Sequence, residues 1–226
     1  MSDHQQPNIT NQTNNTSPSI FDQEAKALWK KLGINKQELS SDDDDDDDET
    51  TKMIKYNHLD AIYKHPKTGA TIFCGDRIAS VSPGLLDANG ITHLVNCTAG
   101  VGEIKNVFEN DRGEFKDKYK YYRFPISNFC DFITEENESV DKFVDPLYSF
   151  IDSALENGKN VLVFCLAGAH RAGTTATSCL IYYEKMDPET AIRVAKSRRS
   201  VMDPIHKLPY FLMRVYDAKV FDRKDT

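Results

Sequence analysis

The feature that most constrains the fold is an uninterrupted apolar run, Val161–Phe164, which leads at once into a short loop with a glycine at its centre. Four consecutive apolar residues are typical of a strand that is buried on both faces, as the central strands of parallel sheets are. Residues 172–185, which follow the loop, have the sequence character of a helix. A buried strand that passes through a loop into a helix is the repeating unit of α/β domains.

The same alternation of strands and helices extends over most of the chain. In residues 140–155 the apolar side chains keep strict i, i+3, i+4 spacing, which predicts a long amphipathic helix. Ser82 and Pro83 provide an N-cap and a first-turn proline for a short helix that Gly90 ends. We therefore predict an α/β fold with a central, mostly parallel sheet flanked by helices and with right-handed connections. The predicted strands are 70–74, 92–97, 121–125 and 161–164, and the further predicted helices are 172–185, 188–199 and 206–221.

The first part of the chain differs in composition from the rest. Residues 1–20 are rich in Asn, Gln, Thr and Ser and offer little apolar surface to bury, so we expect them to be disordered. Asp42–Asp48 is an unbroken acidic run that repels itself, which favours a solvated linker. We thus predict a disordered polar and acidic segment at 1–52 and a folded domain at 55–222, and we expect deletion of 1–52 to change stability and activity little.

One stretch within this first segment has a helical pattern. Phe21, Ala25, Leu28 and Leu32 fall at helical spacing, which predicts a short helix at 21–33. Packing of this helix on its own domain is the interpretation that we favour, and docking on a partner is the alternative.

Charge and cysteine usage argue against several classes of protein. Residues 1–56 carry 12 acidic and 6 basic side chains, which leaves a nearly neutral body with 23 acidic and 22 basic side chains and argues against a nucleic-acid partner. No stretch approaches the ~18 apolar residues of a membrane span, and the polar opening residues lack the apolar stretch of a secretory signal. Five widely spaced cysteines suit neither a disulfide framework nor paired metal ligands. We therefore expect a cytoplasmic or nuclear protein that uses no metal and no cofactor.

The residues that carry chemistry lie in the loop after the apolar strand. Cys165 ends the strand, and Arg171 opens the next helix. The backbone N–H groups of such a loop converge in front of the helix N-terminus, where unpaired donors and the helix dipole favour a phosphate-sized dianion. The same field favours the thiolate form of Cys165, and the planar guanidinium of Arg171 can bind two phosphate oxygens. A buried structural cysteine is the alternative, but it would not require a glycine-containing loop closed by arginine. The residues between the two are Leu166, Ala167, Gly168, Ala169 and His170.

The spacing Cys165-x5-Arg171 resembles the signature of the cysteine-dependent protein tyrosine phosphatases, and its surroundings are similar to their dual-specificity branch. The resemblance extends from about residue 55 to 217. It implies metal-free hydrolysis of phosphotyrosine, and also of phosphoserine and phosphothreonine, through a phosphocysteine intermediate, with phosphorylated proteins as partners. The stretches that carry it are Ile72–Asp76, Gly90–Asn96, Tyr122–Ser127, Phe150–Asp152 and Ala195–Arg199.

The resemblance also implies a role for each site residue. Cys165 attacks phosphorus, while Arg171 and the N–H groups of residues 166–171 bind the phosphate oxygens. A carboxylic acid protonates the departing oxygen. At the family's position for this acid the chain has Asn128, which cannot act as an acid, so Asp131, three residues on, is our candidate.

Three further positions depart from the family's pattern. Phe164 stands where the family has a histidine, Ala172 where it has a hydroxyl residue that assists phosphoenzyme breakdown, and Ile205 where it has an asparagine that supports the loop. Thr174 or Thr175 would replace the hydroxyl if the helix turned one of them inward. We therefore expect a slow enzyme, with a pseudophosphatase that binds phosphorylated partners with little or no turnover as the alternative. No oligomeric state follows from these residues.

Overall fold

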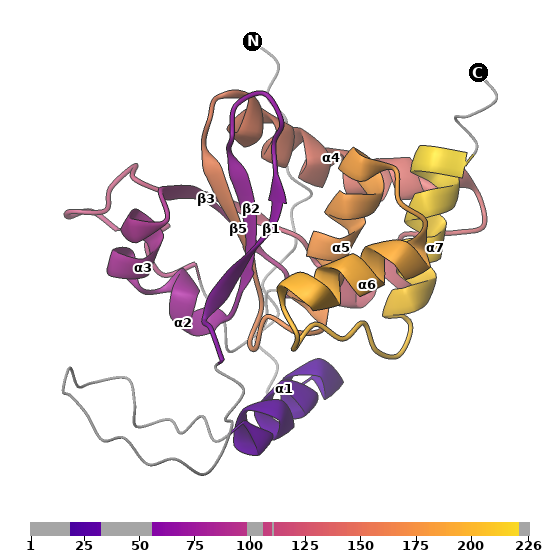
Figure 1. Ribbon diagram of the computed structural model, residues 1–226, viewed down its shortest axis with the longest axis horizontal. Helices are drawn as coiled ribbons and strands as arrows, with labels where there is room; N and C mark the ends of the chain where they lie inside the picture. The colour runs from indigo at the N-terminus through magenta and orange to yellow at the C-terminus, as the bar shows by residue number, and fades with distance from the viewer. Residues whose placement is uncertain (1–18, 33–55, 99–105, 110, 222–226) are drawn as a thin grey trace.

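The centre of the molecule is a five-stranded sheet with helices on both faces (Figure 1). The structure, a computed structural model, describes residues 19–32, 56–98, 106–109 and 111–221, so the Asp42–Asp48 run and most of the segment 1–52 lie outside the described residues. In chain order the strands are β1 (Leu59–Lys64), β2 (Thr71–Gly75), β3 (Ile91–Asn96), β4 (Lys120–Arg123) and β5 (Asn160–Phe164).

The strand order is β1-β2-β5-β3-β4. Strands β2, β5, β3 and β4 run parallel, whereas β1 pairs with β2 in antiparallel orientation. Strand β5 is central, because its Val163 pairs with Cys74 of β2 on one side and with Val95 of β3 on the other. The carboxyl ends of the four parallel strands meet at one edge, which is where open α/β sheets bind ligands. The prediction of an α/β fold with a mostly parallel sheet is thus confirmed.

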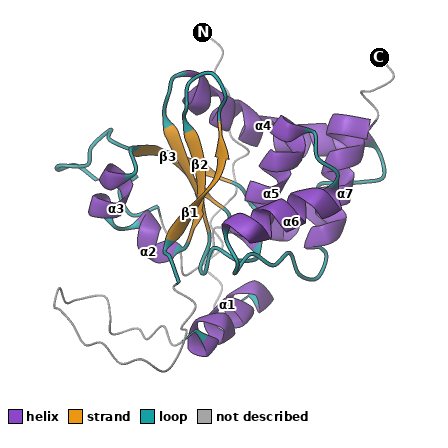
Figure 2. Cartoon of the chain, in the orientation of Figure 1, coloured by secondary structure: helices purple, strands orange, loops and turns teal. Residues whose placement is uncertain are grey.

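Both faces of β5 are buried, as its apolar run predicts. Val161 and Val163 point into a first core, which the helices on one face complete, and Leu162 and Phe164 point into a second core on the opposite face. Figure 2 shows the strands between these two sets of helices. The first core is covered by α4 (Asn137–Glu156), α5 (Arg171–Glu184), α6 (Pro188–Arg198) and α7 (Leu208–Tyr216), and the second by α2 (Arg77–Ser80) and α3 (Pro83–Ala88).

The structure contains elements that the sequence pattern did not indicate. Strand β1 was missed because its register shifts between Ala61 and Tyr63, which interrupts the alternation of inward and outward side chains. Helix α2 and the 3-10 helix η1 (Ile126–Asp131) are too short to show a hydrophobic period. The predicted helix at 206–221 is divided into α7 and a π-helical turn, η2 (Asp217–Phe221).

Helix α1 (Ile20–Lys31) lies against the carboxyl edge of the sheet, apart from the other helices (Figure 1). The Ser19 hydroxyl accepts a hydrogen bond from the Asp22 backbone N–H at 3.2 Å and so caps the helix. Ala25 is 2% exposed and belongs to the second core, and Leu28 and Trp29 pack against that core. The helix therefore packs on its own domain, which argues against the expectation that deletion of 1–52 leaves stability unchanged.

Candidate functional site

The loop from Cys165 to His170 connects the end of β5 to the first turn of α5, and Arg171 is the first helical residue. Every residue of this loop is buried, and Cys165 itself is 2% exposed. The loop lies at the carboxyl edge of the parallel strands, between the sheet and α1 (Figure 1). The structure thus places Cys165 and Arg171 at the two ends of one compact turn.

The carbonyl groups of the loop face outward, each toward a donor elsewhere in the chain. The carbonyls of residues 166 and 169 accept backbone N–H groups of Arg77 and Asp203, both at 3.1 Å. The carbonyls of residues 167 and 168 accept hydrogen bonds from Nη2 and Nε of Arg199, at 3.2 and 2.9 Å respectively. In a trans peptide the N–H points opposite to the C=O, so the N–H groups of residues 167–170 point toward the inside of the turn. Converging N–H groups of this kind form an anion-binding concavity.

Gly168 is required at the centre of the loop for two reasons. Its φ of +63° lies in the left-handed region that residues with a side chain rarely adopt. A Cβ at this position would also lie 2.5 Å from the carbonyl oxygen of Gly75 and 2.9 Å from Nη2 of Arg199. Glycine therefore allows the loop to approach the end of β2 and the Arg199 guanidinium.

Arg199, at the end of α6, holds the outer side of the loop in place. Arg199 is 2% exposed, and its guanidinium donates to the loop carbonyls, to the carbonyl of Asn57 at 2.8 Å and to the Asp60 carboxylate at 2.6 Å. Burial alone would lower the pKa of Arg199, but the ion pair with the Asp60 carboxylate contributes to a pKa that is raised overall, so the group stays charged. Apart from the pair of arginines at the end of the helix, no sequence pattern indicated this role.

Tyr56 supports the same part of the loop. Its hydroxyl lies 2.9 Å from the carbonyl oxygen of Ala167, 3.0 Å from the Asp76 carboxylate and 3.2 Å from Arg199. Burial raises the pKa of Tyr56, so the hydroxyl remains protonated and acts as a donor. Sequence reasoning missed Tyr56 because it precedes the unrecognised strand β1.

Arg171 and His170 are buried beside the concave side of the loop. The Arg171 side chain is 3% exposed, and its Nη2 donates to the carboxylate of Asp22 in α1. His170 Nδ1 lies 2.7 Å from the carbonyl oxygen of Asp203, so this nitrogen carries the hydrogen. Arg171 Nε and His170 Nε2 are buried without a hydrogen-bond partner among the described residues. Two polar groups that lack partners beside converging N–H groups are typical of a ligand site.

Two further thiols lie in the same part of the core as Cys165. The Cys74 thiol donates to the carbonyl of Gly168 at 3.5 Å, and the Cys97 thiol donates to the hydroxyl of Thr175 at 3.4 Å. Burial raises the pKa of both thiols, and the Cys165 sulfur adds to the shift. Cys74 and Cys97 are therefore neutral thiols at physiological pH.

Two of the positions that depart from the family's pattern, Ala172 and Ile205, have identifiable surroundings. Ala172 is fully buried, and the hydroxyls of Thr174 and Thr175 donate to the carbonyls of His170 and Arg171 at 2.7 and 3.0 Å. Both threonine hydroxyls thus bond to the backbone of their own helix. Near Ile205, the backbone N–H and carbonyl of Asp203 contact the loop, and this contact supports the loop without the family's asparagine.

The candidate acid lies on a different element from the loop. Asp131 ends η1 and is exposed, and one of its carboxylate oxygens lies 3.5 Å from Nδ2 of Asn128. The two positions considered for the acid are therefore neighbours at the surface. Helix η1 packs against α5, the helix that begins at Arg171.

The described residues contain neither a cluster suited to a metal ion nor a helix suited to a membrane span. Within that part of the chain no group of three or more His, Cys, Asp or Glu side chains is arranged to hold a metal ion. None of the described helices is both long and apolar enough to span a bilayer.

The sequence of this chain is similar to known phosphatases. The family model for the dual specificity phosphatase catalytic domain matches residues 72–217. The tyrosine-protein phosphatase vhp-1 of Caenorhabditis elegans is 26% identical over 133 residues, which cover 59% of this chain and 18% of that protein. Human dual specificity protein phosphatase 6 is 29% identical over 133 residues, which cover 59% of this chain and 31% of that protein. The matched region is thus less than a third of the length of these relatives.

The fold is also similar to solved structures. Human DUSP28 superimposes with a TM-score of 0.52 at 18% identity, over 72% of this chain and 95% of that one. A leucine rich repeat and phosphatase domain containing protein from Entamoeba histolytica gives a TM-score of 0.51 at 14% identity, over 74% of this chain and 95% of that one. At these identities the similarity concerns the fold alone. The family match, in contrast, spans more than half of the chain and includes the whole loop from Cys165 to Arg171, and the chain therefore belongs to the dual-specificity phosphatase family.

Proposed function

We propose that the chain is a protein phosphatase that hydrolyses phosphotyrosine, and also phosphoserine and phosphothreonine, in protein substrates. The observation that carries the proposal is the orientation of the loop peptides, whose outward carbonyls leave the N–H groups of residues 167–170 directed toward the inside of the turn. This arrangement, together with the buried guanidinium of Arg171, suits a phosphate dianion.

In the first half of the reaction Cys165 is the nucleophile. Its sulfur forms a bond to phosphorus while the bond from phosphorus to the leaving oxygen breaks. The loop N–H groups and Arg171 stabilise the charge on the three remaining phosphate oxygens. Asp131 protonates the leaving oxygen, because a carboxyl group can donate a proton and the neighbouring amide of Asn128 cannot.

In the second half, water attacks phosphorus and the bond to sulfur breaks. Asp131, now a carboxylate, accepts a proton from the water, and Cys165 is regenerated as a thiolate. Because Ala172 has no hydroxyl and those of Thr174 and Thr175 bond to backbone carbonyls, we expect this half to be slow. The same observation favours the second candidate function, a pseudophosphatase that binds phosphorylated proteins with little or no turnover.

The two functions are distinguished by phosphate release from a small aryl phosphate. We expect slow release by the full chain and its loss in Cys165→Ser, while Cys130→Ser, a change to an exposed cysteine outside the loop, keeps the wild-type rate. If the full chain releases no phosphate but still binds a phosphotyrosine peptide in a manner that requires Arg171, the chain is a pseudophosphatase. Release that persists in Cys165→Ser would exclude the proposed mechanism.

A further inference from the structure

Helix α1 covers the phosphate-binding loop of its own chain. Ala25 shares the second core with Leu166, Ala167 and Ala169 of the loop, and Trp29 packs against the same cluster. All of these loop residues are at most 3% exposed. A loop that binds the phosphate of a protein substrate must be open to that protein, so this burial is incompatible with substrate binding while α1 is in place.

The contact with the greatest chemical consequence joins Asp22 to Arg171. One carboxylate oxygen of Asp22 accepts a hydrogen bond from Nη2 of Arg171. The Asp22 side chain is 15% exposed and the Arg171 side chain 3%. The other oxygen accepts the Ser19 hydroxyl at 2.8 Å, which fixes the orientation of the carboxylate at the helix cap. The Asp22 carboxylate thus accepts a hydrogen bond from the Arg171 guanidinium, which in the proposed reaction donates to a phosphate oxygen.

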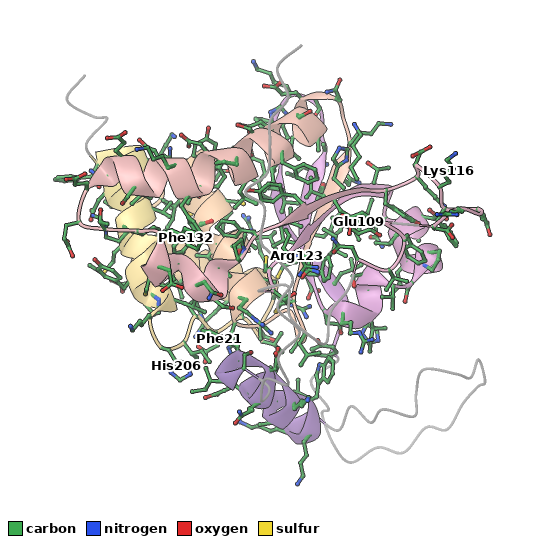
Figure 3. The ribbon with its side chains drawn as sticks, turned by 180° about the vertical axis from the view of Figure 1, so that it is seen from behind. Phe21, Glu109, Lys116, Arg123, Phe132 and His206 are labelled. Carbon is green, nitrogen blue, oxygen red and sulfur yellow. The ribbon has the colours of Figure 1, made fainter. Side chains whose placement is uncertain are left out.

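Additional contacts hold α1 on both sides of this ion pair. The Phe21 ring centre lies 5.7 Å from Cζ of Arg171, and the same ring meets His206 edge to face at 5.8 Å. Glu24 lies 3.4 Å from Nε2 of His206. Figure 3 shows Phe21 of α1 close to His206. Apolar packing, an ion pair and ring contacts together fix the position of the Asp22 side chain over Arg171.

We propose that α1 is an intramolecular inhibitor and that the Asp22 carboxylate competes with the substrate phosphate for Arg171. The inference rests on the proposed function, because it takes Arg171 as the phosphate ligand. It is supported independently by the Nε–H group of Arg171, a donor that is buried without a partner among the described residues even though α1 is docked. Asp22 satisfies only part of the site, so a phosphate dianion that engages more donors displaces it.

This competition lowers the apparent affinity for phosphate. The site is open only in the fraction of molecules in which α1 is undocked. The apparent association constant for phosphate is therefore the intrinsic constant multiplied by that fraction. Removing the negative charge of Asp22 shifts the equilibrium toward the undocked state. The affinity for inorganic phosphate then rises without any change in the loop itself.

Trp29 reports the position of α1, because it is the only tryptophan of the chain and packs against the second core. We would titrate the full chain with inorganic phosphate and follow tryptophan emission and phosphate binding together. The expected result is a red shift on binding, as Trp29 becomes exposed to water. In Asp22→Asn we expect a red-shifted spectrum without ligand and phosphate binding that is about tenfold tighter, within the usual range of coupling between sites.

Glu24→Gln is the matched control, because it removes the same charge from the same helix. Glu24 does not contact Arg171, and its solvent-exposed pair with His206 contributes little to the docking of α1. The phosphate affinity of this variant should remain within about twofold of wild type. Asn in place of Asp22 retains an oxygen that can accept the Ser19 hydroxyl, so the helix cap is preserved.

The outcomes separate this inference from the proposed function. If Asp22→Asn binds phosphate no more tightly than Glu24→Gln, α1 is not an inhibitor, even if the chain hydrolyses an aryl phosphate. If Asp22→Asn binds more tightly with a shifted spectrum but releases no phosphate from the aryl ester, the inhibitory role stands and the enzymatic proposal fails. If no variant binds phosphate, both are wrong, since each takes Arg171 as the ligand.

Discussion

The absence of a hydroxyl at Ala172 determines which half of the proposed reaction is slow. If breakdown of the phosphocysteine limits turnover, the first turnover releases the aryl product in a burst that a slow steady state follows. Ala172→Ser should raise the steady-state rate about tenfold, equivalent to about 1.4 kcal/mol in the second barrier, and leave the burst rate unchanged. Rapid-mixing measurements of aryl product and phosphate test this. A progress curve without a burst, and no gain in the variant, would instead indicate that the first half is limiting.

The identity of the acid is a second question at the scale of single residues. Asp131→Asn should slow the aryl-phosphate burst by about a hundredfold, because no proton is available for the leaving oxygen. The loss should shrink for a substrate whose leaving group is stable as an anion. Asn128→Asp provides the comparison, since it restores a carboxylate at the family's position, 3.5 Å from Asp131. A gain in Asn128→Asp with no loss in Asp131→Asn would assign the acid position to residue 128.

At the scale of elements, α6 positions the loop through Arg199. Arg199→Met removes the guanidinium donor of the carbonyl of residue 168 and one of the two donors of the carbonyl of residue 167, so the N–H groups behind them are held less firmly in direction. We expect phosphate binding and kcat/KM to fall about a hundredfold, comparable to the loss of one oxyanion donor. Arg193→Met, an arginine of the same helix that bonds only to Thr190 among the contacts described, should have no such effect. Equal behaviour of the two variants would exclude a positioning role for Arg199.

The same elements explain how much could be predicted from the sequence. The central strand and the loop from Cys165 to Arg171 were predictable, because burial on both faces and the spacing of the loop are local properties of the sequence. The support by Arg199 and Tyr56 was not, because those residues reach the loop from far along the chain. The contact of Asp22 with Arg171 was also not predictable, because helical spacing indicates an apolar face but not the surface that it covers.

At the scale of the whole molecule, a buried histidine in the sheet connects stability to pH. His93 of β3 is 6% exposed and its ring lies 5.3 Å from Phe150 of α4. Burial, together with the charges of Lys120 and Lys159, lowers the pKa of His93 to about 4. The unfolded chain binds a proton near the ordinary pKa of about 6.5 and the native state does not, so stability falls as the pH decreases between these values.

The expected loss for this one group is about 2 kcal/mol between pH 7.5 and pH 5. Urea unfolding of wild type and His93→Gln at the two pH values measures it. The variant is less stable at pH 7.5 but should lose less on acidification, because its side chain does not titrate. If both proteins lose the same stability, His93 does not contribute to the pH dependence.

The central claim is that the fold brings Cys165 to an anion-binding loop where it forms a covalent bond to phosphorus. The most direct measurement is to quench a single turnover of a small aryl phosphate with acid and to search the peptides for phosphate by mass spectrometry. The account predicts phosphate on the peptide that contains Cys165, and none in Cys165→Ser. Release of the aryl product by the wild-type chain without phosphate on Cys165 at any quench time would contradict it.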